Sequence, residues 1–127
     1  MGSGVEWSKS DYVKTVLDEV GRRLGRNPEP GPGGVHKLGF YLRGPGWPWA
    51  YNGFYVLADD HPCLVVHRRV RLSLQEGKYE VRPNNGPNED KADYVDLVFV
   101  DQYVSRGAPP VVFLDRLIAI LKSARTE

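Results

Sequence analysis

The sequence predicts an α+β fold: a four- to five-stranded antiparallel meander sheet flanked by an N-terminal and a C-terminal helix. Apolar residues recur every three or four positions near both ends of the chain, and at every second position through its middle. These are the periods of a helix and of a strand. The strand-like segments are joined by connections too short for a parallel crossover, so we expect antiparallel neighbours. A chain of 127 residues has the usual size of one domain, and we predict a single domain over 1–127.

The N-terminal helix is predicted over residues 9–24. Its apolar face is formed by Val13, Val16, Leu17, Val20 and Leu24. Ser8 and Asp11 have the spacing of a capping box, with Ser10 as the competing N-cap. Gly25 is placed to end the helix.

The C-terminal helix is predicted over residues 110–124. Pro109 and Pro110 stand where it begins, and proline is tolerated in a first helical turn. The apolar side of this helix is formed by Leu114, Leu117, Ile118 and Leu121. Lys122 and Arg125 follow near its C-terminal end, where the helix dipole favours cations.

The middle of the chain is predicted to be a linker followed by strands. Residues 26–34, RNPEPGPGG, are so rich in proline and glycine that we expect neither a helix nor a ladder there. The predicted strands are 35–42, 51–58, 63–74, 78–82 and 93–100.

Composition and charge exclude several classes of protein. Hydrophobic residues at 41% and charged residues at 26% are ordinary globular values. No apolar run approaches the roughly 20 residues of a membrane-spanning helix, so we expect a soluble, cytoplasmic protein. A single cysteine, Cys63, excludes an intrachain disulfide. The net charge of +1 gives no global argument for a nucleic-acid partner.

The third predicted strand places a basic group on one face. If Leu64 and Val66 face the core, then His67, Arg69 and Arg71 form a row on the open face of the sheet. Such a row could bind an anion, since arginine pairs with both oxygens of a carboxylate or phosphate. It could equally be the solvated face of an antiparallel sheet. Arg68 alternates in step with Leu64 and Val66, so in a regular strand it would face the core with them. It must therefore lie at a sheet end, be paired or mark a bulge.

The turn before this strand contains the candidate metal ligands Asp59 and His61. Both residue types ligate metals, but a third ligand would have to come from elsewhere in the chain. Asp-Asp before His-Pro is also ordinary turn chemistry. We therefore expect no metal or other cofactor, and the sequence contains no nucleophile elbow or phosphate-binding loop.

An aromatic arm precedes the second predicted strand, in GPGWPWAYNGFY. Pro48 restricts Trp47 to an extended conformation, so Trp47 and Trp49 point the same way, with Tyr51 continuing that face. The face either plugs the core or anchors a partner, because tryptophan and tyrosine are enriched in binding hot spots.

These features favour a small non-enzymatic binding protein that recognises another protein, in an immunity-type or regulatory role. The hypothetical contact residues are Trp47, Trp49, Tyr51, His67, Arg69 and Arg71. The acidic stretch from Glu89 to Asp101 is a further place to look for contact with a basic partner. The alternative is a nucleic-acid-binding or metal-dependent hydrolytic protein that uses the His/Arg face of the third strand. The sequence does not specify an oligomeric state.

Overall fold

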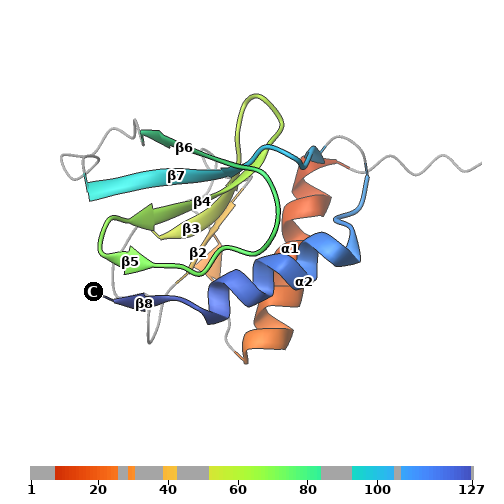
Figure 1. Cartoon of the computed structure of the whole chain (residues 1–127). Helices are drawn as coiled ribbons and strands as arrows, with labels where there is room; N and C mark the ends of the chain where they lie inside the picture. The colour runs from red at the N-terminus through yellow and green to blue at the C-terminus, as the bar shows by residue number, and fades with distance from the viewer. Residues whose placement is uncertain are drawn as a thin grey trace, which may run out of the picture.

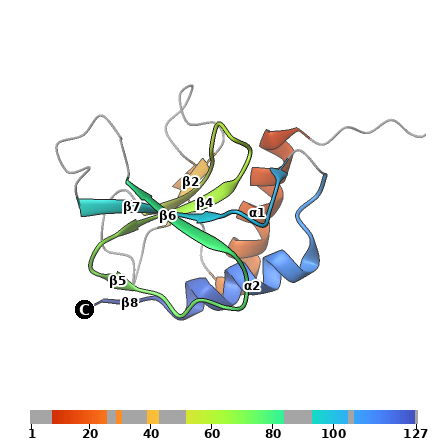
Figure 2. The same ribbon diagram turned by 45° about the horizontal axis from the view of Figure 1, so that its top comes forward.

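The computed structural model has the predicted α+β fold, with two helices flanking an antiparallel sheet (Figure 1). It describes residues 8–25, 29–30, 39–42, 52–83, 93–104 and 107–126. The helices are α1, Lys9–Leu24, and α2, Val111–Lys122. In both views of the molecule they cross each other steeply beside the sheet (Figures 1 and 2).

The main sheet has six strands in the order β1-β2-β3-β4-β7-β6, and each neighbouring pair is antiparallel. Its strands are β1 Glu29–Pro30, β2 Gly39–Tyr41, β3 Gly53–Val56, β4 Pro62–His67, β6 Tyr79–Pro83 and β7 Tyr94–Phe99. A separate two-stranded ladder pairs β5, Val70–Arg71, with β8, Arg125–Thr126.

The strand order departs from a simple meander at β6 and β7. The chain leaves the sheet after β4, pairs β5 with the C-terminal β8, and returns to the sheet as the edge strand β6. Strand β7, the last strand of the main sheet along the chain, then lies between β4 and β6. Figure 2 brings the edge strand β6 to the front of the molecule.

Both helices pack on one face of the sheet. The core there joins residues of α1 and α2 to inward-facing residues of four strands, including Phe40, Phe54, Leu64 and Leu97. Ser8 and Asp11 form the predicted capping box, since the Asp11 amide donates to Ser8 Oγ at 3.1 Å and the Ser8 amide donates to Asp11 Oδ2 at 3.3 Å. Gly25 ends α1 in the left-handed conformation, as the sequence predicts.

The opposite face of the sheet is also apolar at its centre. Cys63, Val65, Tyr94 and Val98 form a second buried cluster there. Tyr55 packs against this cluster, and a Cβ at Gly39 would overlap its ring, whereas a Cβ at Gly53 would overlap the Phe40 carbonyl oxygen. Glycine is therefore required at both positions. The expectation of an open, solvated face on the third strand is wrong at its centre.

The segment predicted as one strand over 63–74 is divided. β4 ends at His67, a turn follows at Arg68 and Arg69, and β5 begins at Val70. Arg68 is thus at a sheet end, one of the three positions open to it, and its Nε lies 3.1 Å from Asp93 Oδ1. If the strand continued, the charged Arg68 side chain would be buried in the core with Leu64 and Val66. Burying an unpaired charge is unfavourable, so the chain turns there.

The linker prediction is wrong at two residues. Glu29 and Pro30 pair with Tyr41 and Phe40 as the edge strand β1. Proline is tolerated there because an edge strand needs hydrogen bonds on one side only. In the described part of the chain, neither helix has the length and hydropathy needed to cross a bilayer.

Candidate functional site

A buried arginine stands out on α2. Arg116 lies three residues after Phe113 and four before Ile120, so it shares the apolar stripe of the helix with two buried side chains. Its own side chain is only 8% exposed. Nη1 and Nη2 each donate to one carboxylate oxygen of Asp101, both at 3.0 Å. This two-point pairing neutralises the buried charge and fixes the guanidinium plane.

Aromatic rings surround the same guanidinium. Its Cζ lies 5.5 Å from the ring centroids of Tyr79 and Phe113 and 5.6 Å from that of Phe99. These distances are within the range of cation–π attraction. Gly77 passes so close to Arg116 Nη1 that any side chain at this position would overlap the guanidinium. The segment before β6 therefore folds directly onto Arg116.

The pKa values of the pair reflect two opposing effects. Burial by itself lowers the pKa of Arg116, but the hydrogen bonds and charge of Asp101 outweigh burial and raise that pKa above its ordinary value. Burial raises the pKa of Asp101, whereas the hydrogen bonds and charge of Arg116 bring it below its ordinary value. Both groups are therefore charged at neutral pH.

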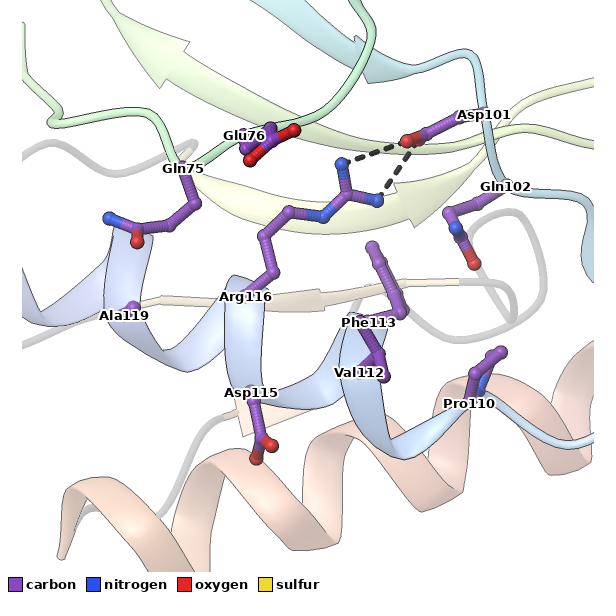
Figure 3. Close-up of a pocket in the computed structure, with 10 residues that line it drawn as sticks. All are labelled: Gln75, Glu76, Asp101, Gln102, Pro110, Val112, Phe113, Asp115, Arg116 and Ala119. Atoms are coloured by element: carbon purple, nitrogen blue, oxygen red, sulfur yellow. Dashed lines mark hydrogen bonds and ion pairs between the residues drawn. The ribbon is translucent and has the colours of Figure 1, made fainter.

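An open cleft of about 420 Å³ lies beside this pair; we call it the α2 cleft. It is lined by Gln75, Glu76, Asp101, Gln102, Pro110, Val112, Phe113, Asp115, Arg116 and Ala119. Figure 3 shows Arg116 extending from α2 toward Asp101, with Glu76 on the same side and Asp115 directed away, toward α1. The lining combines polar or charged residues with the apolar Pro110, Val112, Phe113 and Ala119.

The segment between β5 and β6 closes one side of the α2 cleft, and two links hold it over the helix. The β5–β8 ladder joins its start to the C-terminal end of the chain. The Ser73 amide then donates to Ser123 Oγ at 2.8 Å, just beyond α2. Tyr79 Oη donates to the carbonyl of Gln75 at 2.7 Å. These contacts position Gln75 and Glu76 at the cleft.

The first turn of α2 presents exposed apolar side chains beside the cleft. Val111 is 70% exposed and Val112 is 80% exposed. Pro110, the N-cap residue, makes no side-chain capping hydrogen bond. Single exposed valines are common on protein surfaces. Two in succession at an uncapped helix start are unfavourable for stability, since β-branched residues have low helix propensity and polar caps are preferred.

The charge of the α2 cleft is negative. Its lining residues include three carboxylates, those of Glu76, Asp101 and Asp115, and one guanidinium, that of Arg116. Asp101 is paired with Arg116, and Asp115 Oδ1 lies 2.7 Å from Arg23 Nη1. Among the described residues Glu76 makes no ion pair. The N-terminus of α2 adds roughly half a positive charge, which leaves the lining with a net negative charge.

The His/Arg residues predicted to form one row are separated. His67 ends β4 and is buried, whereas Arg69 and Arg71 are exposed beyond it. His67 Nδ1 accepts a hydrogen bond from the Arg69 amide at 3.1 Å, and Arg71 Nη1 donates to the Arg68 carbonyl at 2.7 Å. His67 is therefore withdrawn from the surface, while Arg69 and Arg71 stay exposed beyond the end of β4.

The predicted metal ligands Asp59 and His61 form hydrogen bonds with different groups. Asp59 Oδ2 accepts from Arg82 Nη1 at 2.7 Å, and this hydrogen bond is the main cause that lowers the Asp59 pKa. His61 Nδ1 lies 2.7 Å from the Gln102 carbonyl, to which it donates. No group of three or more metal-ligating side chains occurs within the part of the chain that the structure describes.

The aromatic arm lies outside the described residues, and so do the first members of the acidic stretch. The predictions for Trp47, Trp49 and Tyr51 therefore stay predictions. Of the acidic stretch, Asp93 pairs with Arg68 and Asp101 pairs with Arg116. Of the described residues in the predicted basic-partner region, Asp101 alone lines the α2 cleft.

Sequence reasoning missed Arg116, Glu76 and Val112. One signal was present for Arg116, because a charged residue on the apolar stripe of a helix must be paired if it is buried. Glu76 and Val112 carried no such signal, since a polar turn and an apolar residue near a helix start are both common. No protein-family model matches this chain, and comparisons with curated proteins and with solved structures give no match either.

Proposed function

We propose that this chain is a non-enzymatic protein-binding module whose recognition surface is the α2 cleft together with Val111 and Val112. The proposal includes the cytoplasmic location and the regulatory or immunity-type role expected from the sequence. The main observation in its support is the pair of exposed valines at a helix start without a side-chain cap. They lie next to a cleft whose lining has a net negative charge. A side chain kept where stability alone disfavours it is a candidate contact residue.

The chemistry of the surface defines the partner. Val111 and Val112 offer apolar area, and Glu76 offers a carboxylate that makes no ion pair among the described residues. The matching partner segment carries an apolar side chain next to a lysine or arginine. Such a cation would lie near Glu76 with its aliphatic stem against the helix, because long cationic side chains bury their stems on apolar surface.

Rigidity of the cleft wall also supports binding. Arg116 is held by two hydrogen bonds and by three aromatic rings, so its charge is positioned before any partner arrives. A rigid wall loses little conformational entropy on association. We rank the alternative functions, nucleic-acid binding or metal-dependent hydrolysis, below this one because His67, the imidazole of the predicted row, is buried.

The experiment is a comparative pull-down from cells that make the protein. Wild-type protein, Val112→Asp and Glu76→Lys are immobilised separately, and the recovered proteins are identified by mass spectrometry. We expect at least one protein to be recovered by wild type and lost with both variants. Its affinity, measured with the purified pair, should fall by about tenfold or more for each variant, since a central contact contributes roughly 1.4 kcal/mol or more.

Matched control variants separate loss of binding from loss of folding. Val81→Asp changes an exposed valine on β6, and Asp18→Lys reverses an exposed charge on α1. Both should retain the partner. The proposal fails if every protein recovered by wild type is recovered equally by Val112→Asp and Glu76→Lys.

A further inference from the structure

Strand β6 leaves one side of the main sheet open. Among the described residues the strand order ends at β6, and the backbone of β6 pairs there with β7 alone. Val81, at its centre, is 64% exposed, and Glu80 and Pro83 are exposed too. The N–H and C=O groups on the outer side of an edge strand can pair with a second strand. An occupant of this edge must therefore also be an extended segment.

The sequence of β6 is complementary to itself. In Tyr79–Pro83, YEVRP, one acid and one base flank the central valine. When two copies of this strand run antiparallel with Val81 opposite Val81, Glu80 of each copy lies opposite Arg82 of the other. We propose that β6 is a homodimerisation edge at which two copies of this chain pair in this register and join their sheets.

Charge selects this register over its neighbours. A two-fold axis perpendicular to the sheet can pass only through a pair of identical residues, so the possible registers are centred on single positions. A register centred on Glu80 places two carboxylates opposite each other, and one centred on Arg82 places two guanidinium groups opposite each other. Like charges in direct cross-strand pairs are destabilising. Of the registers centred on Glu80, Val81 and Arg82, only the one centred on Val81 pairs opposite charges at both positions.

Two features limit the strength of the pairing. The strand is short and ends in Pro83, which has no amide hydrogen to donate. Arg82 already binds Asp59 at 2.7 Å and Glu80 of its own strand at 2.6 Å, and a cross-strand acid would share its guanidinium with them. We therefore expect a weak, reversible dimer whose population rises with protein concentration, rather than a permanent one.

The first experiment is sedimentation equilibrium of the full chain over the widest attainable concentration range. Wild type should show a monomer–dimer equilibrium. Val81→Lys places two ammonium groups face to face and should weaken the dimer by about tenfold or more. Asp18→Lys is the control, because Asp18 is also exposed but lies on α1, outside both β6 and the α2 cleft; its dimer constant should equal that of wild type. Melting midpoints show that each variant is folded.

The second experiment uses charge to identify the contact. Glu80→Lys makes both flanking positions basic, and Arg82→Glu makes both acidic, so each variant alone should be monomeric. An equimolar mixture restores opposite charges at both cross-strand positions and should form a heterodimer. The proposal is overturned if wild type is monomeric throughout, if the single variants dimerise like wild type, or if the mixture gives no heterodimer. It does not depend on the function of the α2 cleft.

Discussion

Two buried polar centres lie in different parts of this molecule, and they are satisfied in different ways. At the α2 cleft, the side chains of Arg116 and Asp101 satisfy each other through two hydrogen bonds. The second centre lies at the end of β4, where the Asn52 side chain is fully buried. Its Oδ1 accepts a hydrogen bond from the backbone amide of His67 at 2.8 Å. Asn52 Nδ2 has no partner among the described residues.

The two centres differ in whether substitutions can remove all of their polar groups. Both members of the Arg116–Asp101 pair are side chains, so a substitution can remove the whole polar interaction and leave apolar packing. The His67 amide is part of the backbone and stays in the protein whatever replaces Asn52. A backbone donor that loses its buried partner keeps its full desolvation cost. The first centre is therefore replaceable as a pair, and the second is not.

The largest expected effect comes from breaking the first pair on one side. Asp101→Ala leaves a buried guanidinium without its carboxylate and should lower the free energy of unfolding by about 3 kcal/mol. The double variant Asp101→Ala, Arg116→Met removes the charge as well and should be more stable than Asp101→Ala alone. Urea unfolding measures both. A double variant whose loss equals or exceeds that of Asp101→Ala would show that the pair is not replaceable.

Asp115→Ala is the control for this prediction. Asp115 pairs with Arg23 on the surface, with 58% of its side chain exposed. Exposed ion pairs contribute about 0 to 1 kcal/mol. Its loss should therefore change the free energy of unfolding by less than about 1 kcal/mol, which separates burial from charge as the cause of the Asp101 effect.

A smaller effect is expected at the second centre. Asn52→Ala removes the acceptor of the His67 amide and should lower the free energy of unfolding by about 2 kcal/mol. No second substitution at His67 should recover this loss, because the donor is backbone. Gln75→Ala, at an exposed position, is the control. An Asn52→Ala protein as stable as wild type would mean that the His67 amide finds another acceptor.

The smallest effect is a pH dependence of the second centre. Burial lowers the pKa of His67; Arg68 and Arg69 lower it further, and Asp93 opposes them. The folded protein thus keeps a neutral ring, while the unfolded chain takes up a proton near the ordinary pKa of about 6.5. The titration of His67 therefore leaves the free energy of unfolding unchanged above that pH and lowers it as the pH falls below that value.

Urea unfolding at about pH 7.5 and about pH 5.5 tests this, since both values lie above the range in which carboxylates titrate. Wild type should be less stable at the lower pH. His67→Gln, which cannot titrate, should lose less stability between the two conditions. Equal pH dependence in the two proteins would assign the effect to other groups.

Local signals in the sequence predicted the fold class and the ends of α1. Ser8, Asp11 and Gly25 act within one helical turn of the boundary they set, so their positions alone are informative. The placement of β7 between β4 and β6 is not local. Its neighbour β4 is separated from it in the sequence by β5 and β6, and periodicity carries no information about partners.

The candidate site was largely beyond prediction for the same reason. Asp101 was included in a predicted contact region because of its charge, but its partner Arg116 comes from the last helix. Glu76 becomes part of the α2 cleft only because Ser73 binds Ser123 and draws the segment over α2. Side chains brought together by tertiary contacts leave no shared pattern in the sequence.

The position of β7 between β4 and the edge strand β6 has a consequence for synthesis on the ribosome. Strand β6 is made before β7, and β7 is its only neighbour in the sheet. Until the nascent chain extends past β7, β6 has two unpaired edges, and β4 lacks one of its neighbours. Unpaired strands in a nascent chain are prone to aggregation. The charges of Glu80 and Arg82 and the proline that ends β6 are the kinds of residue that protect such a strand during this interval.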